Sequence, residues 1–295
     1  MKRKTYGLLV LLMVYLVATS LGLLLAYFIK DYFPMLITVL LCDVFATVIV
    51  WAFGVLFKTA SMYDPYWSIQ TFIIYLTLLI YYNNFNLFTI IPLVAIGLYS
   101  IRLTVNFIIG FDSLSYIDWR YRMLSKKTGR AFQLVNLFGI CMFPTLVVYS
   151  ASIPLFIYST LESFSYIDII GSLIVIGGTI IELISDIQMK KFIKTRSSRE
   201  EVINIGLWKY SRHPNYLGEI IFWYGLAFVF VLSSIGEWYF VFGAVINTLL
   251  FAFISIPLAD NHLKTYKTGY EEYRRETRNL LPLPRFTNVS VDKEV

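Results

Sequence analysis

The sequence predicts an all-α integral membrane protein, a polytopic bundle of about eight transmembrane helices. Of its 295 residues, 58% are hydrophobic and only 15% are charged, and the mean hydropathy is +0.67. A soluble domain of this size carries more charge and shorter apolar runs. The apolar runs are long and unbroken rather than alternating, which indicates membrane helices and not barrel strands.

The N-terminal part of the chain contains four predicted spans. The first follows the basic start MKRKTY, as a signal peptide would, but its apolar run is longer than a signal core and lacks a clear small-residue cleavage site. We therefore interpret it as a retained span. A helix needs roughly 20 apolar residues to cross a bilayer, so the third segment is short. The four segments are 7–29, 34–57, 66–82 and 87–110.

The remaining part contains four more predicted spans and three cytoplasmic segments. The fifth span contains Pro144 and Pro154, so the number of spans could shift by one. The last cytoplasmic segment is charged and aromatic, and we expect it to form a short surface helix, with disorder after Arg285. The spans are 132–158, 166–189, 216–233 and 238–258, and the cytoplasmic segments are 111–131, 190–215 and 259–295.

The distribution of basic residues supports eight crossings. With eight spans, all of the 25 Lys and Arg residues except Lys30 and Arg102 fall on the side of the N-terminus. This is the positive-inside pattern, so both termini are expected in the cytoplasm. The net charge of +6 therefore reflects topology, and we expect no nucleic-acid partner.

Standard catalytic motifs are absent. The sequence contains neither of the glycine-rich phosphate loops, no serine nucleophile elbow and no H-E-x-x-H motif. It has only two His residues, and its two cysteines, Cys42 and Cys141, lie in apolar runs where we expect them to be reduced packing residues. We expect no metal site. The chemistry must come from Arg, Asn, Glu, Tyr and His at the ends of helices.

Ionisable side chains inside the predicted spans are the main functional signal. A central charge costs roughly 2.5–3.5 kcal/mol on translocon scales, so such residues are functional hypotheses by default. Several polar residues recur three or four positions apart and therefore share a helix face. Each set lies near the cytoplasmic end of its segment, which predicts a polar cavity open to the cytoplasm. The sets are Glu182, Asp186 and Lys190; Tyr99 and Arg102; Asn215 and Glu219; and His262 and Tyr266.

Structural interpretations of the same residues stay open. Glu182 and Asp186 could only neutralise a neighbouring Arg or Lys inside the bundle. Asp64 precedes Pro65 and could cap the third span, since Asp is a favoured capping residue. Arg212 could be one more positive-inside residue, and His262 could be a surface residue. Asp43 is isolated in the sequence and receives no role.

The segment GLWKYSRHPNYLGEIIFWYG, residues 206–225, resembles the C-terminal domain of the steroid 5α-reductase family, including its bacterial DUF1295-type branch. A related pattern occurs in isoprenylcysteine carboxyl methyltransferases, so this segment indicates the superfamily but does not select the reaction. The resemblance runs from about Asp64 to Pro284. It implies a seven-helix reductase-like core with one extra N-terminal span, divided as 1–60, 61–284 and a disordered tail 285–295, in the bacterial inner membrane.

Four further segments carry the resemblance to the site residues. LYSIRLTVNF is similar to the stretch that holds a catalytic tyrosine and a cofactor-binding arginine, and YDPYWS lies where the reductases have a catalytic carboxylate, here Asp rather than Glu. SYIDWRYRM resembles a cytoplasmic loop of the bacterial branch, and IELISDIQMKKFIK and DNHLKTY resemble cofactor-contacting segments. The resemblance implies that Tyr99 and Asp64 are catalytic. It implies cofactor contacts by Arg102, Arg120, Tyr121, Glu182, Asp186, Lys190, Arg212, Asn215, Glu219, His262 and Tyr266.

The function that this resemblance implies is reduction of an enone double bond by NADPH. Tyr99 and Asp64 would polarise the substrate carbonyl, and the apolar spans would admit a lipophilic substrate from the membrane lipid. A steroid, another polycyclic enone and a fatty-acyl enone all fit. The alternatives are a membrane methyltransferase that uses S-adenosylmethionine and a non-enzymatic lipid-binding or transport protein.

Overall fold

The computed structural model describes residues 2–282 and confirms the all-α fold. About 79% of the chain is helical, and between residues 2 and 282 the only β-type contact is one isolated bridge between Ser211 and Arg278. The expected disordered tail, 285–295, lies outside the described residues. The chain forms two compact units, Met1–Ile176 with Trp223–Asn247 and Gly177–Phe222 with Thr248–Val295. Each unit is described separately below.

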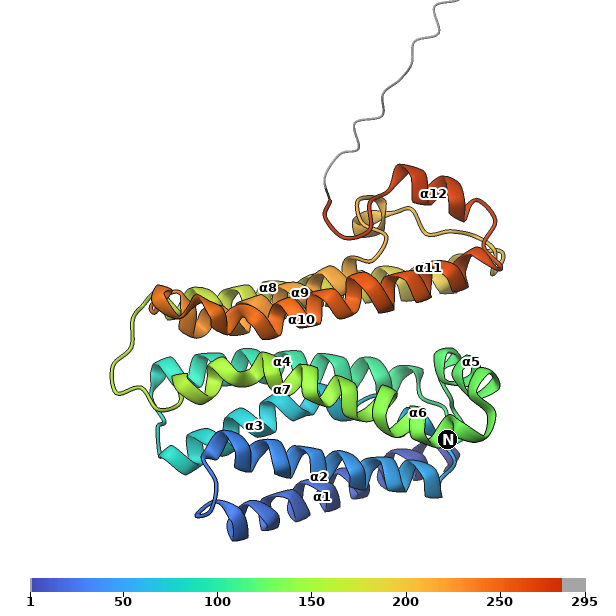
Figure 1. Cartoon of the computed structure of the whole chain (residues 1–295). Coiled ribbons are helices and arrows are strands. Elements are labelled where there is room, and N and C mark those ends of the chain that lie inside the picture. The colour runs from blue at the N-terminus through green and yellow to red at the C-terminus, as the bar shows by residue number, and fades with distance from the viewer. Residues whose placement is uncertain (1, 283–295) are drawn as a thin grey trace, which may run out of the picture. The chain divides into compact units, whose positions relative to one another are not determined.

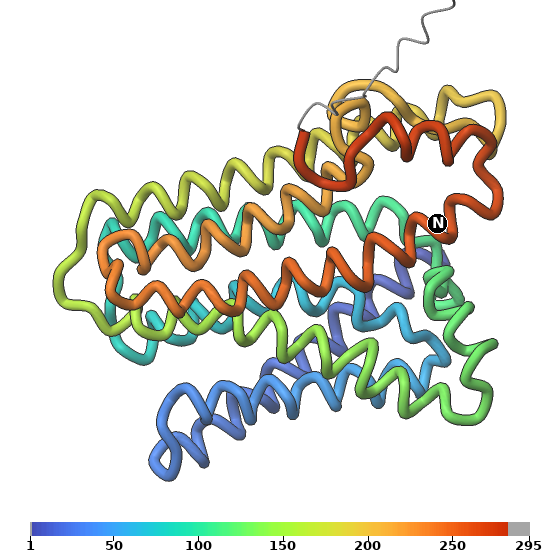
Figure 2. The backbone as a smooth tube through the Cα atoms, turned by 45° about the horizontal axis from the view of Figure 1, so that its top comes forward, coloured from blue at the N-terminus to red at the C-terminus, as the bar shows by residue number. Residues whose placement is uncertain are grey.

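Unit 1 contains the N-terminal helices (Figure 1). The first two helices pack along each other as an antiparallel hairpin, and α3 packs against α4 and α7 (Figure 2). The last helix is preceded by a stretch of wider, π-helical turns at Asn136–Met142. The helices are α1 (Lys2–Ile29), α2 (Met35–Leu56), α3 (Tyr66–Tyr82), α4 (Leu87–Gly110), α5 (Trp119–Thr128), α6 (Phe132–Val135) and α7 (Phe143–Tyr158).

Three further helices contribute residues to both units, and unit 2 adds the C-terminal ones. A second π-helical stretch, Phe251–Ser255, joins two helices of the last span. The shared helices are α8 (Asp168–Thr195), α9 (Pro214–Val231) and α10 (Phe242–Leu250), and they are followed by α11 (Ile256–Lys264) and α12 (Tyr270–Glu276).

Local sequence signals explain where α3 and α4 end and begin. Asn83 closes α3 in the left-handed conformation, with φ of 49°, which Asn tolerates better than most residues. Asn86 then caps α4, because its side-chain oxygen accepts hydrogen bonds from the backbone N–H groups of Phe88 and Thr89 at 2.9 and 3.2 Å. Thr89 returns a bond by accepting from the Asn86 N–H, which completes a capping box.

Most predicted spans coincide with observed helices. Within residues 2–282, seven helices are long and apolar enough to cross a membrane, against eight predicted segments. The difference is α3, whose bounds are those predicted but whose 17 residues are fewer than the roughly 20 that a span needs. The last span was placed too short, because helical structure continues through α11 to Lys264 rather than ending at 258.

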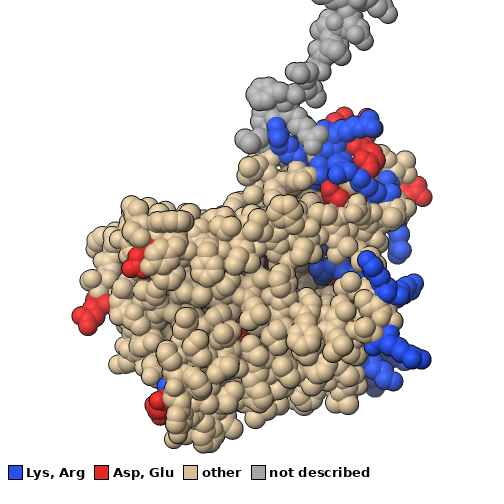
Figure 3. Space-filling view, viewed as in Figure 1, with Lys and Arg blue, Asp and Glu red and all other residues tan. Residues whose placement is uncertain are grey.

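One helix was not predicted. The segment 111–131 was expected to be a cytoplasmic connection, but it contains α5. Its start is fixed by Asp118, whose carboxylate accepts a hydrogen bond from the Arg120 backbone N–H at 2.9 Å, and its last turn carries Lys126 and Lys127. Both features stabilise a helix through its dipole. In unit 1, Lys and Arg side chains gather at the end where α1 begins and α5 lies (Figure 3), as the charge distribution predicted.

Candidate functional site

Tyr99 lies on α4 in the core of unit 1. Its side chain is fully buried, and its ring meets the Trp223 ring edge to face at a centroid distance of 6.3 Å. Arg102 follows one turn later and is half-buried. The two residues therefore share a helix face, as their spacing predicted. A buried phenol beside an indole is held in a fixed orientation, which suits a hydrogen-bond donor that must not reorganise.

Asp64 was predicted to polarise the substrate carbonyl together with Tyr99. Its carboxyl group instead hydrogen-bonds to a different tyrosine, Tyr121. The Tyr121 hydroxyl donates to Asp64 Oδ1 at 2.5 Å. Asp64 does not cap α3 through its side chain, because the residue at the cap is Pro65 and no capping bond is formed. Burial raises the pKa of the Asp64 carboxyl from 3.8 to about 7, against the lowering effects of the Tyr121 hydrogen bond and the Arg120 charge.

Arg120 and Tyr121, both predicted to bind a cofactor, stand next to Asp64 at the start of α5. Arg120 Nε lies 2.8 Å from Asp118 Oδ1, and its guanidinium covers the Tyr121 ring at 5.5 Å. The structure therefore brings together one predicted catalytic residue and two predicted cofactor residues. Tyr121 also lines a cavity of about 360 Å³ whose wall carries Lys58, Arg122 and Lys126.

The raised pKa of Asp64 predicts a pH dependence of stability. A carboxyl whose pKa is about 7 in the folded protein and 3.8 as a free side chain binds more protons folded than unfolded between these values. Its contribution is complete below pH 4 and is lost as the pH rises to about 7. We expect the free energy of unfolding of the wild type to fall over this range relative to Asp64→Asn, measured by chemical denaturation. A difference that grows in favour of the wild type as the pH rises would contradict the assignment.

In unit 2, one face of α8 carries Glu182, Asp186 and Lys190, as their spacing predicted. Glu182 is 2% exposed, whereas Asp186 and Lys190 are half-buried. Gly218 of α9 makes room for Glu182, because a Cβ at this glycine would lie 2.6 Å from Glu182 Cγ. The two helices therefore touch where α9 carries its next residue, Glu219, which is 5% exposed. Two buried carboxylates thus come from adjacent turns of two packed helices.

Arg212 is held by protein groups. It is 3% exposed, and its guanidinium donates to the backbone oxygens of Arg274 and Thr277 at 3.0 and 2.6 Å, to Asp260 Oδ2 at 3.0 Å and to the side chain of Asn279. These contacts tie the segment before α9 to the segment after α12. Phosphate binding by Arg212 stays a prediction. In the structure, its guanidinium holds the segments of unit 2 together.

Asp260 is the centre of this buried cluster, and the sequence analysis gave it no specific role. Besides Arg212, it accepts hydrogen bonds from the Tyr270 hydroxyl at 2.7 Å and contacts His213 Nε2 at 2.8 Å. The His213 ring stacks on Tyr216 at 5.2 Å. In the sequence, Asp260 was visible only as a carboxylate within a predicted polar C-terminal segment. Its partners could not be predicted, because they lie 10 to 48 residues away.

The remaining predicted residues of unit 2 are half-buried or exposed. Asn215 is half-buried in the first turn of α9, one turn before Glu219. His262 is half-buried near the end of α11, and its ring meets the exposed Tyr266 ring at 5.2 Å. Among residues 2–282, no group of three or more His, Cys, Asp or Glu side chains is arranged to hold a metal ion.

The predicted site residues therefore form two sets, each within one unit. Unit 1 holds Tyr99, Arg102, Asp64, Arg120 and Tyr121, and unit 2 holds the other eight. A family model described as "Protein of unknown function (DUF1295)" matches residues 50–277, which leaves most of the first two helices outside the match. No curated protein and no solved structure shows significant similarity to the chain.

Proposed function

We propose that this chain, which belongs to the DUF1295 family of proteins of unknown function, is a membrane-embedded reductase that uses NADPH to reduce an enone double bond in a lipophilic substrate. The family is loosely related to the steroid 5α-reductase-like proteins, which agrees with the motifs in the sequence. The observation that carries the proposal is a pair of carboxylates in unit 2: Glu182 and Glu219 are buried at the contact of α8 with α9.

The polar side chains of α8 and α9 fit a dinucleotide. Glu219 and Glu182 are acceptors for an amide N–H or a ribose hydroxyl, and Asn215 at the start of α9 offers both donors and an acceptor. Lys190 lies one turn beyond Asp186 on α8 and supplies positive charge for phosphates. Ionisable side chains inside membrane spans are functional hypotheses by default, and here two carboxylates meet at one helix contact.

When bound, NADPH would supply a hydride to the β-carbon of the enone. The π-electrons move to the carbonyl oxygen, and the resulting enolate takes a proton from water at its α-carbon. The Tyr99 phenol donates a hydrogen bond to the oxygen as its negative charge develops. Asp64, whose pKa is about 7, is protonated in part at neutral pH and can then donate as well, while its Oδ1 accepts the hydrogen bond from Tyr121.

Ligand-dependent thermal stabilisation tests the cofactor. We expect NADPH to stabilise the purified protein by about 2.7 kcal/mol at 100 times its Kd, and S-adenosylmethionine to have no effect. The matched variant is Glu219→Gln, which keeps the size of the side chain but weakens it as an acceptor and should lose much of the NADPH shift. Stabilisation by S-adenosylmethionine alone would replace the reductase by a membrane methyltransferase, and a shift with neither ligand would reject both.

We also propose that both termini face the cytoplasm of a bacterial cell, in the inner membrane. The proposal is supported by the basic residues of unit 1, which gather at one end of its helices (Figure 3). Ser163, between α7 and α8, and Ser198, after α8, are both exposed and serve as a matched pair. We expect a membrane-impermeant maleimide to label Ser163→Cys in intact cells and Ser198→Cys only after permeabilisation. The reverse pattern would invert the topology.

A further inference from the structure

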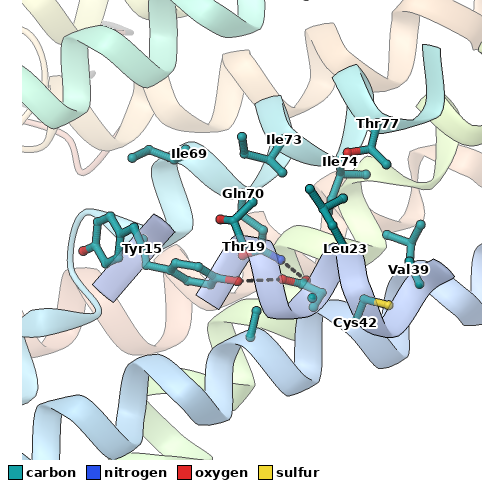
Figure 4. Close-up of a pocket in the computed structure, with 15 residues that line it drawn as sticks. Tyr15, Thr19, Leu23, Val39, Cys42, Ile69, Gln70, Ile73, Ile74 and Thr77 are labelled. Carbon is teal, nitrogen blue, oxygen red and sulfur yellow. Dashed lines mark hydrogen bonds between the residues drawn. The ribbon is translucent and has the colours of Figure 1, made fainter. Parts of the chain in front are cut away.

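A small cavity lies between α1, α2 and α3 of unit 1, and its carboxylate is already satisfied by protein groups. Its volume is about 90 Å³, and most of its wall is apolar (Figure 4). Asp43, the one acidic residue among those described in its lining, is 6% exposed. The Tyr66 hydroxyl donates to Oδ1 at 3.3 Å, and the Gln70 side-chain amide donates to Oδ2. A ligand would therefore find no unpaired carboxylate oxygen here.

A larger cavity, of about 360 Å³, is lined by the end of α2 and by residues of α5 and α6. This volume falls within the range of about 300–1,000 Å³ that is usual for sites of small ligands. Lys58, Arg122 and Lys126 line it, and no Asp or Glu is among its described lining residues. Arg122 and Lys126 are four residues apart on α5 and therefore share a helix face. All of the described lining residues lie between Gly54 and Asn136, so the cavity belongs to unit 1 alone.

The positive charge of this cavity is not neutralised by the protein. All three basic side chains are exposed, and within residues 2–282 none of them forms an ion pair. The Arg122 Nε donates to the Ile117 backbone oxygen at 2.9 Å, which leaves the two terminal nitrogens available for an anion. The Asp118 carboxylate, one helical turn before Arg122, is already paired with Arg120 at 2.8 Å. A cavity with several unpaired cations attracts an anionic ligand.

The backbone at Lys58 is unusual for a lysine. Its φ is 55°, in the left-handed region that favours glycine. The Lys58 N–H donates to the Val55 oxygen at 3.1 Å and the Thr59 N–H to the Gly54 oxygen at 2.9 Å, the hydrogen-bond pattern with which a helix commonly ends at glycine. Lysine is an unfavourable residue for this position, which indicates a use for its side chain.

Exposed apolar side chains stand beside the same cavity. Val55, which lines it, is 37% exposed, and the neighbouring Leu56 is 68% exposed. Leu134, which follows the lining residue Gln133 on α6, is 63% exposed. Apolar side chains that are exposed together mark contacts with a membrane or a partner, and in a chain with spanning helices the acyl chains of the lipid cover them. The ligand that matches both features has an anionic group and apolar chains.

We propose that this cavity binds the phosphate of an anionic phospholipid, whose acyl chains lie along the exposed apolar side chains at the end of α2 and on α6. Basic pockets between membrane helices bind anionic headgroups. The guanidinium of Arg122 matches the geometry of phosphate oxygens, and the two lysines add point charges. Free inorganic phosphate has the same charge chemistry but would leave the apolar side chains without a partner.

The site is separate from the proposed reductase. Among the residues predicted to act in the reaction or to bind the cofactor, only Tyr121 lines the cavity, and its hydroxyl is engaged by Asp64 at 2.5 Å. An absence of NADPH binding would therefore leave this proposal standing. Conversely, an absence of lipid binding would say nothing about the cofactor.

Thermal unfolding of the full chain in micelles of a neutral detergent tests the proposal. The probes are dioleoylphosphatidylglycerol, which is anionic, and dioleoylphosphatidylcholine, which has the same acyl chains and phosphate but no net charge. We measure the mole fraction of each lipid that gives half of its maximal stabilisation. We expect this midpoint to be at least about tenfold lower for phosphatidylglycerol, because several cations contribute. Equal midpoints, or no stabilisation by either lipid, would overturn the proposal.

Matched variants on α5 locate the effect. Lys126→Gln should raise the midpoint for phosphatidylglycerol about fivefold, which corresponds to about 1 kcal/mol for one basic residue at an anionic headgroup. Lys127→Gln removes the same charge from the same last turn of α5 but lies outside the described lining, so the midpoint should not change. Equal effects of the two variants would show a diffuse attraction by surface charge and would reject the cavity.

Lys58→Gly separates binding from folding. Glycine suits the left-handed backbone at this position, so the variant should unfold at no lower temperature than the wild type in the absence of lipid. Its midpoint for phosphatidylglycerol should nevertheless rise about fivefold, as for Lys126→Gln. An unchanged midpoint in a folded Lys58→Gly protein would reject the cavity as the lipid site.

Inorganic phosphate and NADPH distinguish the possible sources of the phosphate group. We expect neither of them, added in excess, to raise the midpoint for phosphatidylglycerol beyond the effect of sodium chloride at equal ionic strength, which controls for screening. A rise with inorganic phosphate would assign the cavity to the free anion. A rise with NADPH would assign it to the cofactor. Either result would overturn the assignment to a lipid.

Discussion

Replacing Arg212 by methionine is expected to lower the free energy of unfolding by about 3–5 kcal/mol, the cost of removing one partner from a buried ion pair. The change removes the guanidinium that lies 3.0 Å from the buried Asp260 carboxylate. It also removes the donors that hold the backbone oxygens of Arg274 and Thr277. Thermal and chemical denaturation in detergent, followed by tryptophan fluorescence, measures the loss.

Lys209→Met is the matched control for this experiment. Lys209 is exposed and only three residues upstream, so its replacement should change the free energy of unfolding by less than about 0.5 kcal/mol. Adding Asp260→Asn to Arg212→Met should recover part of the loss, because it neutralises a buried carboxylate that then keeps only the Arg274 guanidinium, at 3.7 Å, and the His213 ring as basic partners. If Arg212→Met unfolds like the control, the guanidinium is not a structural tie, and its predicted role at a phosphate regains weight.

Replacing Tyr99 by phenylalanine is expected to reduce turnover about 100- to 1,000-fold, the usual effect of deleting one donor to a developing oxyanion. The expectation rests on the proposed reductase. The ring and its contact with Trp223 are retained, so the thermal shift with NADPH should hardly change. Single-turnover oxidation of NADPH with an enone substrate measures the chemical step separately from binding.

Tyr81→Phe is the comparison for the phenylalanine variant, because Tyr81 is 49% exposed on the far part of α3 and should tolerate loss of its hydroxyl. Equal losses of turnover and of NADPH binding in Tyr99→Phe would mean that the residue supports the fold or the cofactor. Unchanged turnover would remove Tyr99 from the reaction. Only a loss confined to the chemical step supports a donor role.

The helices were predictable because their signals are local. The apolar run of α4 is bounded by Asn86, which caps it, and that of α3 by Asn83, which closes it, so both sets of bounds agree with the prediction. The start of α5 depended on a single capping residue, Asp118, within a basic stretch that has no apolar period. The extension of the last span through α11 was missed, because its charged residues make the segment look like a loop by hydropathy. One of these residues, Asp260, is nevertheless buried by its partners in unit 2.

The partners within the sites were not predictable from spacing. The sequence placed Glu182, Asp186 and Lys190 on one helix face because that face repeats every turn. The contact of Asp64 with Tyr121 joins residues 57 positions apart, and no periodicity encodes such a contact. The same holds for Asp43 and Gln70, which are 27 positions apart. Asp43 therefore looked isolated, although it belongs to a buried hydrogen-bonded group.

The ties of Arg212 also set an order of events during biosynthesis. Its partners Asp260, Arg274, Thr277 and Asn279 follow it by 48 to 67 residues. These residues leave the ribosome after Arg212 does, so the guanidinium must stay hydrated or temporarily bound elsewhere while they are synthesised. This part of unit 2 can close only after Asn279 has been synthesised, and a chain released before that point would leave the Arg212 guanidinium without these partners.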